Sequence, residues 1–296
     1  MSQEPRAEFV LLPELDTELE EFAHRLDRDF LVAATTLTGN QLRVLVHNYH
    51  EIQRLRISLS NAALAMERNG QPTDFVRTLA KELKKLESSI TRVMNNWIQE
   101  YPVAEWALRQ VGVGPVTVAT LLAYIDVERC RTAGAVWRYC GLDPTITHTK
   151  GQPTPYNRRL KRICYVLGDT FRKRSKDPDC FYGRIYRLRK EYEVERNERG
   201  EYADQARARL EEAERRRYRI AASQREAWSQ GKLTAAHIDL RARRYAVKLF
   251  LSHFAWVYWE TEKNEPWPLP YPVAFLGHID VIPPPDYTPL PRASAA

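Results

Sequence analysis

The chain has few of the features that mark metal-bound, secreted or membrane proteins. Its 296 residues include only four cysteines, and no two of them form a CxxC pair. Such wide spacing gives no zinc-finger signal and the histidines add no ligand pattern, so we expect reduced thiols, no metal and no cofactor. No run of about 18 apolar residues occurs, which argues against a membrane partner. The first residues are acidic rather than basic and then apolar, so we expect a cytoplasmic protein without a secretory signal.

Strand patterns are also scarce, and helical periodicity replaces them, so the predicted fold class is all-α. Two heptad series flank the turn at residues 69–72 (Asn-Gly-Gln-Pro) and predict an antiparallel coiled-coil hairpin over residues 41–102. The first series is interrupted by Arg56 at one seam position. The second series is clean, and we expect it to form the seam of the hairpin or of a dimer through Leu79, Leu83, Leu86, Ile90, Val93 and Trp97.

Charge is unevenly spread along the chain, whose net charge is +7. Residues 1–40 form an acidic N-terminal segment with nine acids against three bases. Residues 101–190 reverse this balance, with seventeen Lys and Arg against seven Asp and Glu. A concentrated positive region attracts polyphosphate better than the same charge spread over a surface. Membrane-surface binding is less favoured, because the basic region lacks the broad apolar face of an interfacial helix.

Residues 103–183 are predicted to form a compact basic domain that opens with a glycine turn. Gly112 and Gly114 precede Pro115 in a pattern typical of helix-hairpin-helix turns. Backbone N–H groups in such a turn, at the positive end of the next helix, can hold a phosphate without reading sequence. A plain structural turn between helices explains the same glycines, and the sequence leaves both interpretations open.

A basic helix near the end of this domain is the stronger nucleic-acid signal. Helix is expected from Asn157, with apolar positions on one face and arginines largely off that face. A solvated helix face is the alternative interpretation. His148 and Tyr156 could stack on unpaired bases or simply pack locally. The candidate RNA- and phosphate-binding residues are His148, Lys150, Tyr156, Asn157, Arg158, Arg159, Lys161, Arg162, Arg172, Lys173 and Arg174.

The remaining third of the chain divides by composition. Residues 184–244 mix both charge signs with little apolar content, which is typical of a solvated helical arm. Apolar and aromatic character returns in residues 245–265, which we expect to close the core of the basic domain. Residues 266–296 contain nine of the eighteen prolines and are predicted to be extended.

No catalytic constellation accompanies the basic residues. Asp126, Asp143 and Asp169 are among the acids inside the basic domain, and two of them lie at predicted helix ends, where capping is their usual role. Two-metal nucleases need several carboxylates that converge on one site. The sequence therefore predicts that the chain has no catalytic residues and is not an enzyme.

An ordered set of segments resembles the C-terminal domain of bridge-RNA-guided transposases. The resemblance covers about residues 103–259 apart from the charged arm. The loop that carries a nucleophilic serine in those transposases has Thr149, Lys150 and Gly151 here, and the expected acidic N-terminal nuclease domain is replaced by the hairpin. The matching segments are Gln110-Val111-Gly112-Val113-Gly114-Pro115-Val116-Thr117-Val118-Ala119, residues 133–139, Gly141-Leu142-Asp143-Pro144, Asn157-Arg158-Arg159-Leu160-Lys161-Arg162 and residues 242–251.

A coiled-coil hairpin before such a domain is also similar to the Nop domain of box C/D ribonucleoproteins. TIGR-Tas proteins of bacteria and phages resemble both lineages, and this chain looks like a nuclease-less member with a stand-alone Nop-like domain. The resemblance implies a non-catalytic homodimer that holds a guide RNA, pairs it with target DNA, and works with or without a separate nuclease or effector. The alternatives are a transposase-derived DNA-binding regulator without guide RNA, and a residual recombinase that uses the hydroxyl of Thr149.

Overall fold

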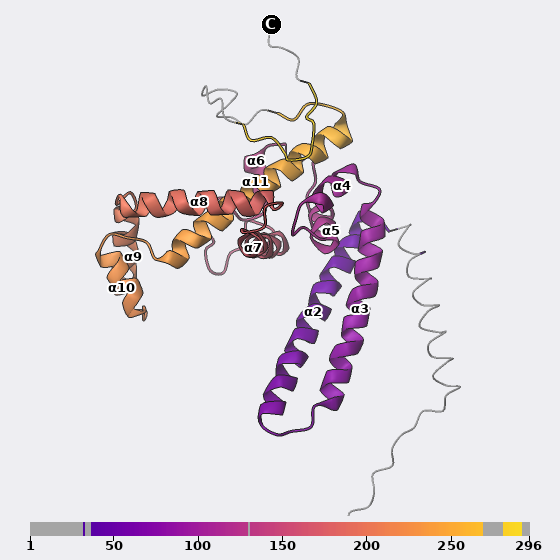
Figure 1. Ribbon diagram of the computed structural model, residues 1–296, viewed down its shortest axis with the longest axis horizontal. Coiled ribbons are helices and arrows are strands. Elements are labelled where there is room, and N and C mark those ends of the chain that lie inside the picture. The colour runs from indigo at the N-terminus through magenta and orange to yellow at the C-terminus, as the bar shows by residue number, and fades with distance from the viewer. Residues whose placement is uncertain (1–31, 33–36, 130, 269–280, 292–296) are drawn as a thin grey trace, which may run out of the picture. The chain divides into compact units, whose positions relative to one another are not determined.

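The computed structural model describes residues 32, 37–129, 131–268 and 281–291, and in them the only regular secondary structure is helical. The predicted all-α class is confirmed. The chain divides into two compact units, Met1–Glu100 and Tyr101–Ala296 (Figure 1). Most of the predicted acidic segment lies outside the described residues. No helix within the described ranges is long and apolar enough to cross a membrane.

The first unit contains a hairpin of two long helices, α2 (Gly39–Arg68) and α3 (Asp74–Ile98), which run side by side (Figure 1). A capping box starts α2, because the Thr38 hydroxyl accepts from the Gln41 amide while the Gln41 side chain accepts from the Thr38 amide. Gly70 adopts a positive φ of 66° in the turn, a conformation that side chains disfavour. The turn lies at the predicted position.

The contact face of α3 differs in part from the predicted leucine seam. Ile90, Val93 and Trp97 are buried as expected, but Leu79 and Leu86 are 39% and 41% exposed. Glu87 is buried instead, where it pairs with Arg56 of α2. Leu79 and Leu86 thus lie outside the buried face of α3, and their place in a dimer seam stays a prediction. Heptad spacing allows two neighbouring stripes on one helix, and the Arg56–Glu87 pair selects the stripe that faces α2.

The second unit is built around one long helix, α11 (Ala235–Lys263). It packs against α4 (Pro102–Arg109), α6 (Ala133–Tyr139), α7 (Arg158–Lys173) and α8 (Phe181–Glu198), while α5 (Pro115–Tyr124) packs against α4 and α7 (Figure 1). Aromatic side chains fill the centre, where Phe250 of α11 contacts the rings of Trp106, Phe171 and Tyr182. The closing role expected for residues 245–265 belongs to a helix that starts ten residues earlier.

The charged arm folds on a small core of its own. Helix α9 (Ala203–Arg216) and helix α10 (Ala222–Ser229) follow α8 at the far end of the unit (Figure 1). Six buried residues hold the arm together: Tyr202, Ala206, Ala213, Trp228, Leu233 and Ile238. These apolar residues are sparse and scattered among charged ones, which is why the sequence indicated only a solvated arm.

The described part of the proline-rich tail, residues 281–291, is attached to the second unit by hydrogen bonds. The Trp106 indole donates to the Pro285 carbonyl at 2.7 Å. The buried Glu260 carboxylate accepts from the Tyr287 hydroxyl and the Leu290 amide. Extended segments without internal hydrogen bonds need such partners, and α4 and α11 supply them.

Candidate nucleic-acid interface

Helix α7 is the most strongly amphipathic helix of the second unit, and its capping follows from the sequence. The Asn157 side chain accepts from the amides of Arg159 and Leu160, which fixes the start of the helix. The predicted apolar face is buried throughout, including Leu160, Leu167 and Phe171. Asn157 thus has a structural role that accounts for it without a nucleic-acid contact.

The opposite face of α7 carries exposed cations. Arg158, Arg162 and Tyr165 follow one another at helical spacings of four and three, so they form a line along the helix, and Arg159 lies beside them. Tyr165 is 60% exposed, an unusual fraction for a large aromatic residue. We call these four residues the cationic stripe. None of its three arginines has a carboxylate of the described residues within ion-pair distance. Most arginines of the charged arm, residues 184–244, do have one.

The cations at the C-terminal end of α7 have carboxylate partners. Asp169 pairs with Arg172 at 2.9 Å, with Lys173 at 2.7 Å and with Arg243 of α11 at 3.3 Å. Hydrogen bonds from Lys173 and Arg172 lower the pKa of the Asp169 carboxyl to about 2. Arg174 lies 3.7 Å from Asp177. Among the predicted phosphate-binding residues, Arg172, Lys173 and Arg174 are therefore the ones that already have a carboxylate partner.

The predicted residues before α7 are divided between packing and exposure. The Tyr156 ring lies against Gly141, where a Cβ atom would approach it to 2.8 Å, and the Lys161 ammonium covers the ring at 4.1 Å. This favours local packing over base stacking for Tyr156. His148 and Lys150 are exposed in the loop before α7, and the His148 ring contacts the Gln152 carbonyl at 3.2 Å.

The glycine turn between α4 and α5 is packed against α7. Gly112 has a φ of 92°, and a Cβ atom there would lie 2.6 Å from the Thr170 side chain. Amides of the turn are partly used within it, because Val113 donates to Gln110 and Thr117 to Gly114. Gly114 has open space around its Cα. Gly112 is therefore explained by packing, while a phosphate contact at Gly114 stays a prediction.

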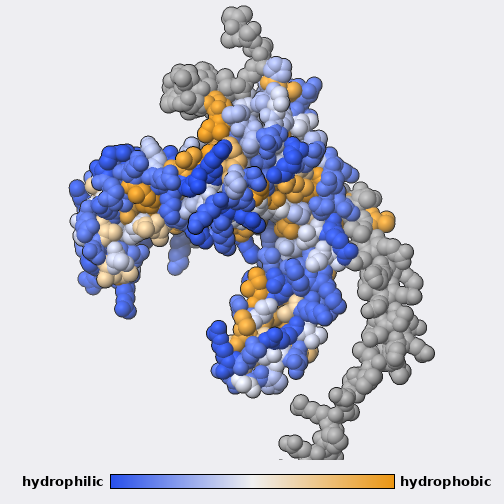
Figure 2. Space-filling model, viewed as in Figure 1, coloured by the Kyte–Doolittle hydropathy of each residue, from blue (hydrophilic) through white to orange (hydrophobic). Residues whose placement is uncertain are grey.

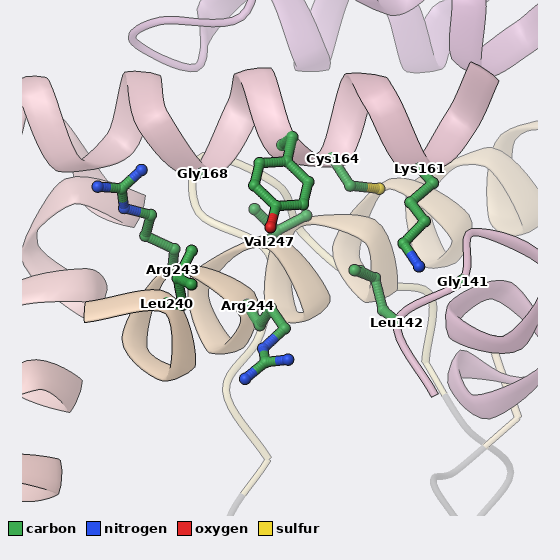
Figure 3. A pocket seen from close by; sticks show the side chains of 10 residues that line it. Gly141, Leu142, Lys161, Cys164, Gly168, Leu240, Arg243, Arg244 and Val247 are labelled. Atoms are coloured by element: carbon green, nitrogen blue, oxygen red, sulfur yellow. The ribbon is translucent and has the colours of Figure 1, made fainter. Parts of the chain in front are cut away.

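A cavity of about 170 Å³ separates α7 from α11 beside the cationic stripe. Figure 3 shows Lys161 and Cys164 on the α7 side, with Arg243 and Arg244 on α11. Arg244 extends away from α7 in this view, whereas Arg243 extends toward it. Cys164 and Cys140 are buried thiols, and their mutual hydrogen bond together with burial raises the pKa of Cys140. Both thiols are buried and therefore packed rather than reactive.

Sequence reasoning did not identify Tyr165, nor did it assign the arginines of α9 and α11 to any site. Tyr165 follows Arg158 by seven residues, so the spacing was available as a signal. The arginines of the arm can be recognised as members of one site only in the folded structure, where α8, α9 and α11 bring them together. Within the described ranges, no group of three or more His, Cys, Asp or Glu side chains could hold a metal ion.

Residues 107–168 match the family described as Transposase IS116/IS110/IS902 family. The matched segment spans about a fifth of the chain and includes the glycine turn, the loop before α7 and most of α7. No curated protein and no solved structure is significantly similar to the chain. The chain therefore contains a segment similar to this transposase family, which supports the coarser part of the resemblance.

This match corrects one prediction. The sequence predicted that the chain is not an enzyme, because no convergent carboxylates could be found. Transposases break and rejoin DNA strands, so a segment of that family points to an enzymatic family. The search for paired carboxylates presupposed one kind of active site, and the matched segment identifies no catalytic residues.

Proposed function

We propose that the chain is a transposase-related nucleic-acid-binding protein that holds a guide RNA through the cationic stripe of α7 and pairs that RNA with target DNA. The stripe is the observation that carries the proposal. Its arginines are exposed and have no carboxylate partner, they lie within the transposase-like segment, and Tyr165 at the end of their line offers a ring to a base. Arginine's planar fork suits phosphate oxygens, and aromatic rings stack on unpaired bases.

The division of labour follows from the chemistry of the stripe. Contacts to phosphates position a nucleic acid but carry no sequence information. A protein that holds a guide by its backbone leaves the guide's bases free, and base pairing then supplies specificity for the target. The proposal therefore needs no base-specific side chain in the protein.

A homodimer is part of the proposal, supported by the outer face of the hairpin. Apolar side chains remain exposed there: Ile57, Leu64, Phe75, Leu79 and Leu86. Orange patches interrupt the hydrophilic surface of the hairpin in Figure 2. Phe75 is 79% exposed, and a second copy of the hairpin would remove such surface from water.

The test compares a stripe variant with a matched control for binding to a fluorescent RNA hairpin and to a DNA duplex. Arg158→Ala, Arg159→Ala and Arg162→Ala together should weaken binding strongly and reduce the log–log salt slope by roughly 1 per lost phosphate contact. The control replaces Arg207, Arg215 and Arg216 on α9 by Ala and removes the same charge. Equal binding of both triple variants at physiological salt would overturn the proposal.

Sequencing the nucleic acid that copurifies after a high-salt wash separates the two versions of this function. A homogeneous short RNA supports the guide. Random fragments, together with preference for the DNA duplex in the binding test, favour a DNA-binding protein without a guide.

DNA strand exchange is a second candidate function, favoured by the transposase match. The loop before α7 carries four threonine hydroxyls. Thr145 donates to Asp143 at 2.7 Å, whereas Thr149 is exposed. Loss of strand joining in Thr149→Ala but not in Thr145→Ala would assign the reaction to Thr149, and unchanged joining in both would remove this loop from the mechanism.

A further inference from the structure

A second cationic surface lies in the second unit, in a groove of about 470 Å³ that runs along α11. Its floor is one face of that helix, where His237, Arg241, Arg244 and Lys248 recur at helical spacing. One wall comes from α8 and α9, and the other from Lys161 with the loop before α7. We call this the arginine groove. Its cations are Lys161, Arg189, Arg209, Arg241, Arg244 and Lys248.

The two carboxylates that line the groove are already engaged. Glu193 accepts from Arg189 at 2.6 Å and from Arg241 at 2.8 Å, and also from the Tyr202 hydroxyl. Asp143 accepts from the amide and the hydroxyl of Thr145. These two carboxylates therefore offset only part of the positive charge in the groove.

Four of the six cations have no carboxylate of the described residues within ion-pair distance. They are Lys161, Arg209, Arg244 and Lys248. Arg209 is the most informative, because its Nε is buried and has no hydrogen-bond partner in the described part of the chain. A buried guanidinium donor without an acceptor costs free energy, and a bound anion would satisfy it.

The pKa shifts in the groove come first from burial and then from neighbouring positive charges. Burial, followed by the charges of Arg241 and Arg209, lowers the pKa of Arg244. Burial and then Arg209, Arg244 and Arg241 lower the pKa of His237 to about 4. Burial also lowers the pKa of Lys248, which Arg244 reinforces. Cations that repel one another in the free protein stabilise a polyanion when it binds.

The shape of the groove favours a strand over a small anion. The face of α11 from His237 to Lys248 is roughly 16 Å long at 1.5 Å per residue. Phosphates of one strand of a duplex repeat about every 3.4 Å along the axis, so several can lie within that length. Lys161 lines the groove and belongs to the same helix as the cationic stripe, so a backbone held by the stripe can continue into the groove.

We infer that the arginine groove binds the phosphodiester backbone of a nucleic-acid strand, with Arg209 and Arg244 as its principal contacts. The inference rests on the proposed function and extends it, because it assigns the charged arm to binding. The arm then acts as a clamp: α9 supplies Arg209 from one side, and α11 supplies Arg244 from the floor.

The experiment uses the full-length protein with Arg209→Gln and Arg244→Gln together. Neither side chain has an ion-pair partner among the described residues, and glutamine keeps hydrogen-bonding capacity, so the fold should persist. The matched control, Arg207→Gln with Arg215→Gln, removes the same charge from α9 outside the groove. Binding to a fluorescent RNA hairpin, a single-stranded RNA and a DNA duplex is measured across a salt series.

The groove variant should lose roughly tenfold in affinity and lower the salt slope by about 1 to 2, whereas the control should stay near the wild type. The probe that loses most identifies the strand that lies in the groove. Thermal unfolding without nucleic acid gives an independent readout. The groove variant should unfold at an equal or higher temperature than the wild type, because two repelling cations are gone, and a merely structural role would lower it.

Each failure has its own signature. If the groove variant binds like its control while the stripe variant loses affinity, the groove inference is wrong and the proposed function stands. If the stripe variant binds normally and the groove variant does not, the site of the proposed function is misplaced. If the wild type binds none of the three probes, both are wrong.

Discussion

Helices α3 and α7 are both strongly amphipathic, yet they leave different chemistry exposed. On α7 the face turned to solvent carries arginines and a tyrosine, while on α3 it carries Phe75, Leu79 and Leu86. An exposed cationic line suits a polyanion, whereas an exposed apolar line suits another protein surface. The kind of partner that a helix binds is therefore indicated by the side chains that its packing leaves exposed.

The contrast is sharpest at buried positions. Helix α7 buries only apolar side chains, and α3 buries Glu87 against Arg56. A buried ion pair contributes little net stability, but it specifies which faces meet. The hairpin therefore uses a charged contact for register, while α7 keeps its charges for the outside.

The largest predicted effect lies on the buried face of α7. Leu167 is 1% exposed, so Leu167→Ala should lower the free energy of unfolding by about 2 to 5 kcal/mol through lost burial and a residual cavity. Urea unfolding measures this. Arg162→Ala on the opposite face is the control and should change stability by less than about 0.5 kcal/mol. Equal costs at both positions would mean that the two faces of α7 are not distinct.

An intermediate effect is expected from pH, through two histidines of the second unit. Burial lowers the pKa of His253 to about 4, and the Tyr182 hydroxyl occupies its Nδ1 while Nε2 contacts the Ile282 carbonyl. His237 has a similarly low pKa. Their unfolded pKa is near 6.5.

Because the folded form resists protonation, the stability that these groups contribute is complete above pH 6.5 and is lost as pH falls towards 4. The loss should reach about 2 to 3 kcal/mol per histidine. Urea unfolding at pH 7, 5.5 and 4.5 measures it, and His253→Gln should flatten the profile. If His253→Gln and the wild type lose stability equally as pH falls, His253 does not cause the pH dependence. Carboxylates such as Asp169 contribute only below about pH 4.

The smallest effect on folding is expected on the outer face of α3. Leu79→Gln with Leu86→Gln should change the stability of an isolated chain by less than about 1 kcal/mol, because both side chains are already partly exposed. The same change should weaken a dimer, and sedimentation across a concentration series measures that. If the wild type is monomeric at every concentration, the proposal that a second copy covers the exposed apolar side chains of the hairpin is wrong.

Much of the fold was readable from local patterns. Gly70 and Pro72 place the hairpin turn, Pro115 starts α5, and Asn157 caps α7, because each of these residues acts through its own backbone or a neighbour's. The apolar face of α7 followed from spacing alone. The interface was readable only in part, since Tyr156 and Asn157 proved to pack and cap, and Tyr165 was overlooked.

The sequence by itself determined the all-α class, the positions of these turns and caps, and the arginines of α7, because helix periodicity and local hydrogen bonds act over a few residues. Only the tertiary structure decided which stripe of α3 meets α2, which cations are neutralised, and that Arg209 and Arg244 line one groove. Those outcomes depend on residues far apart in the chain, such as Arg56 with Glu87, whose pairing no local pattern contains.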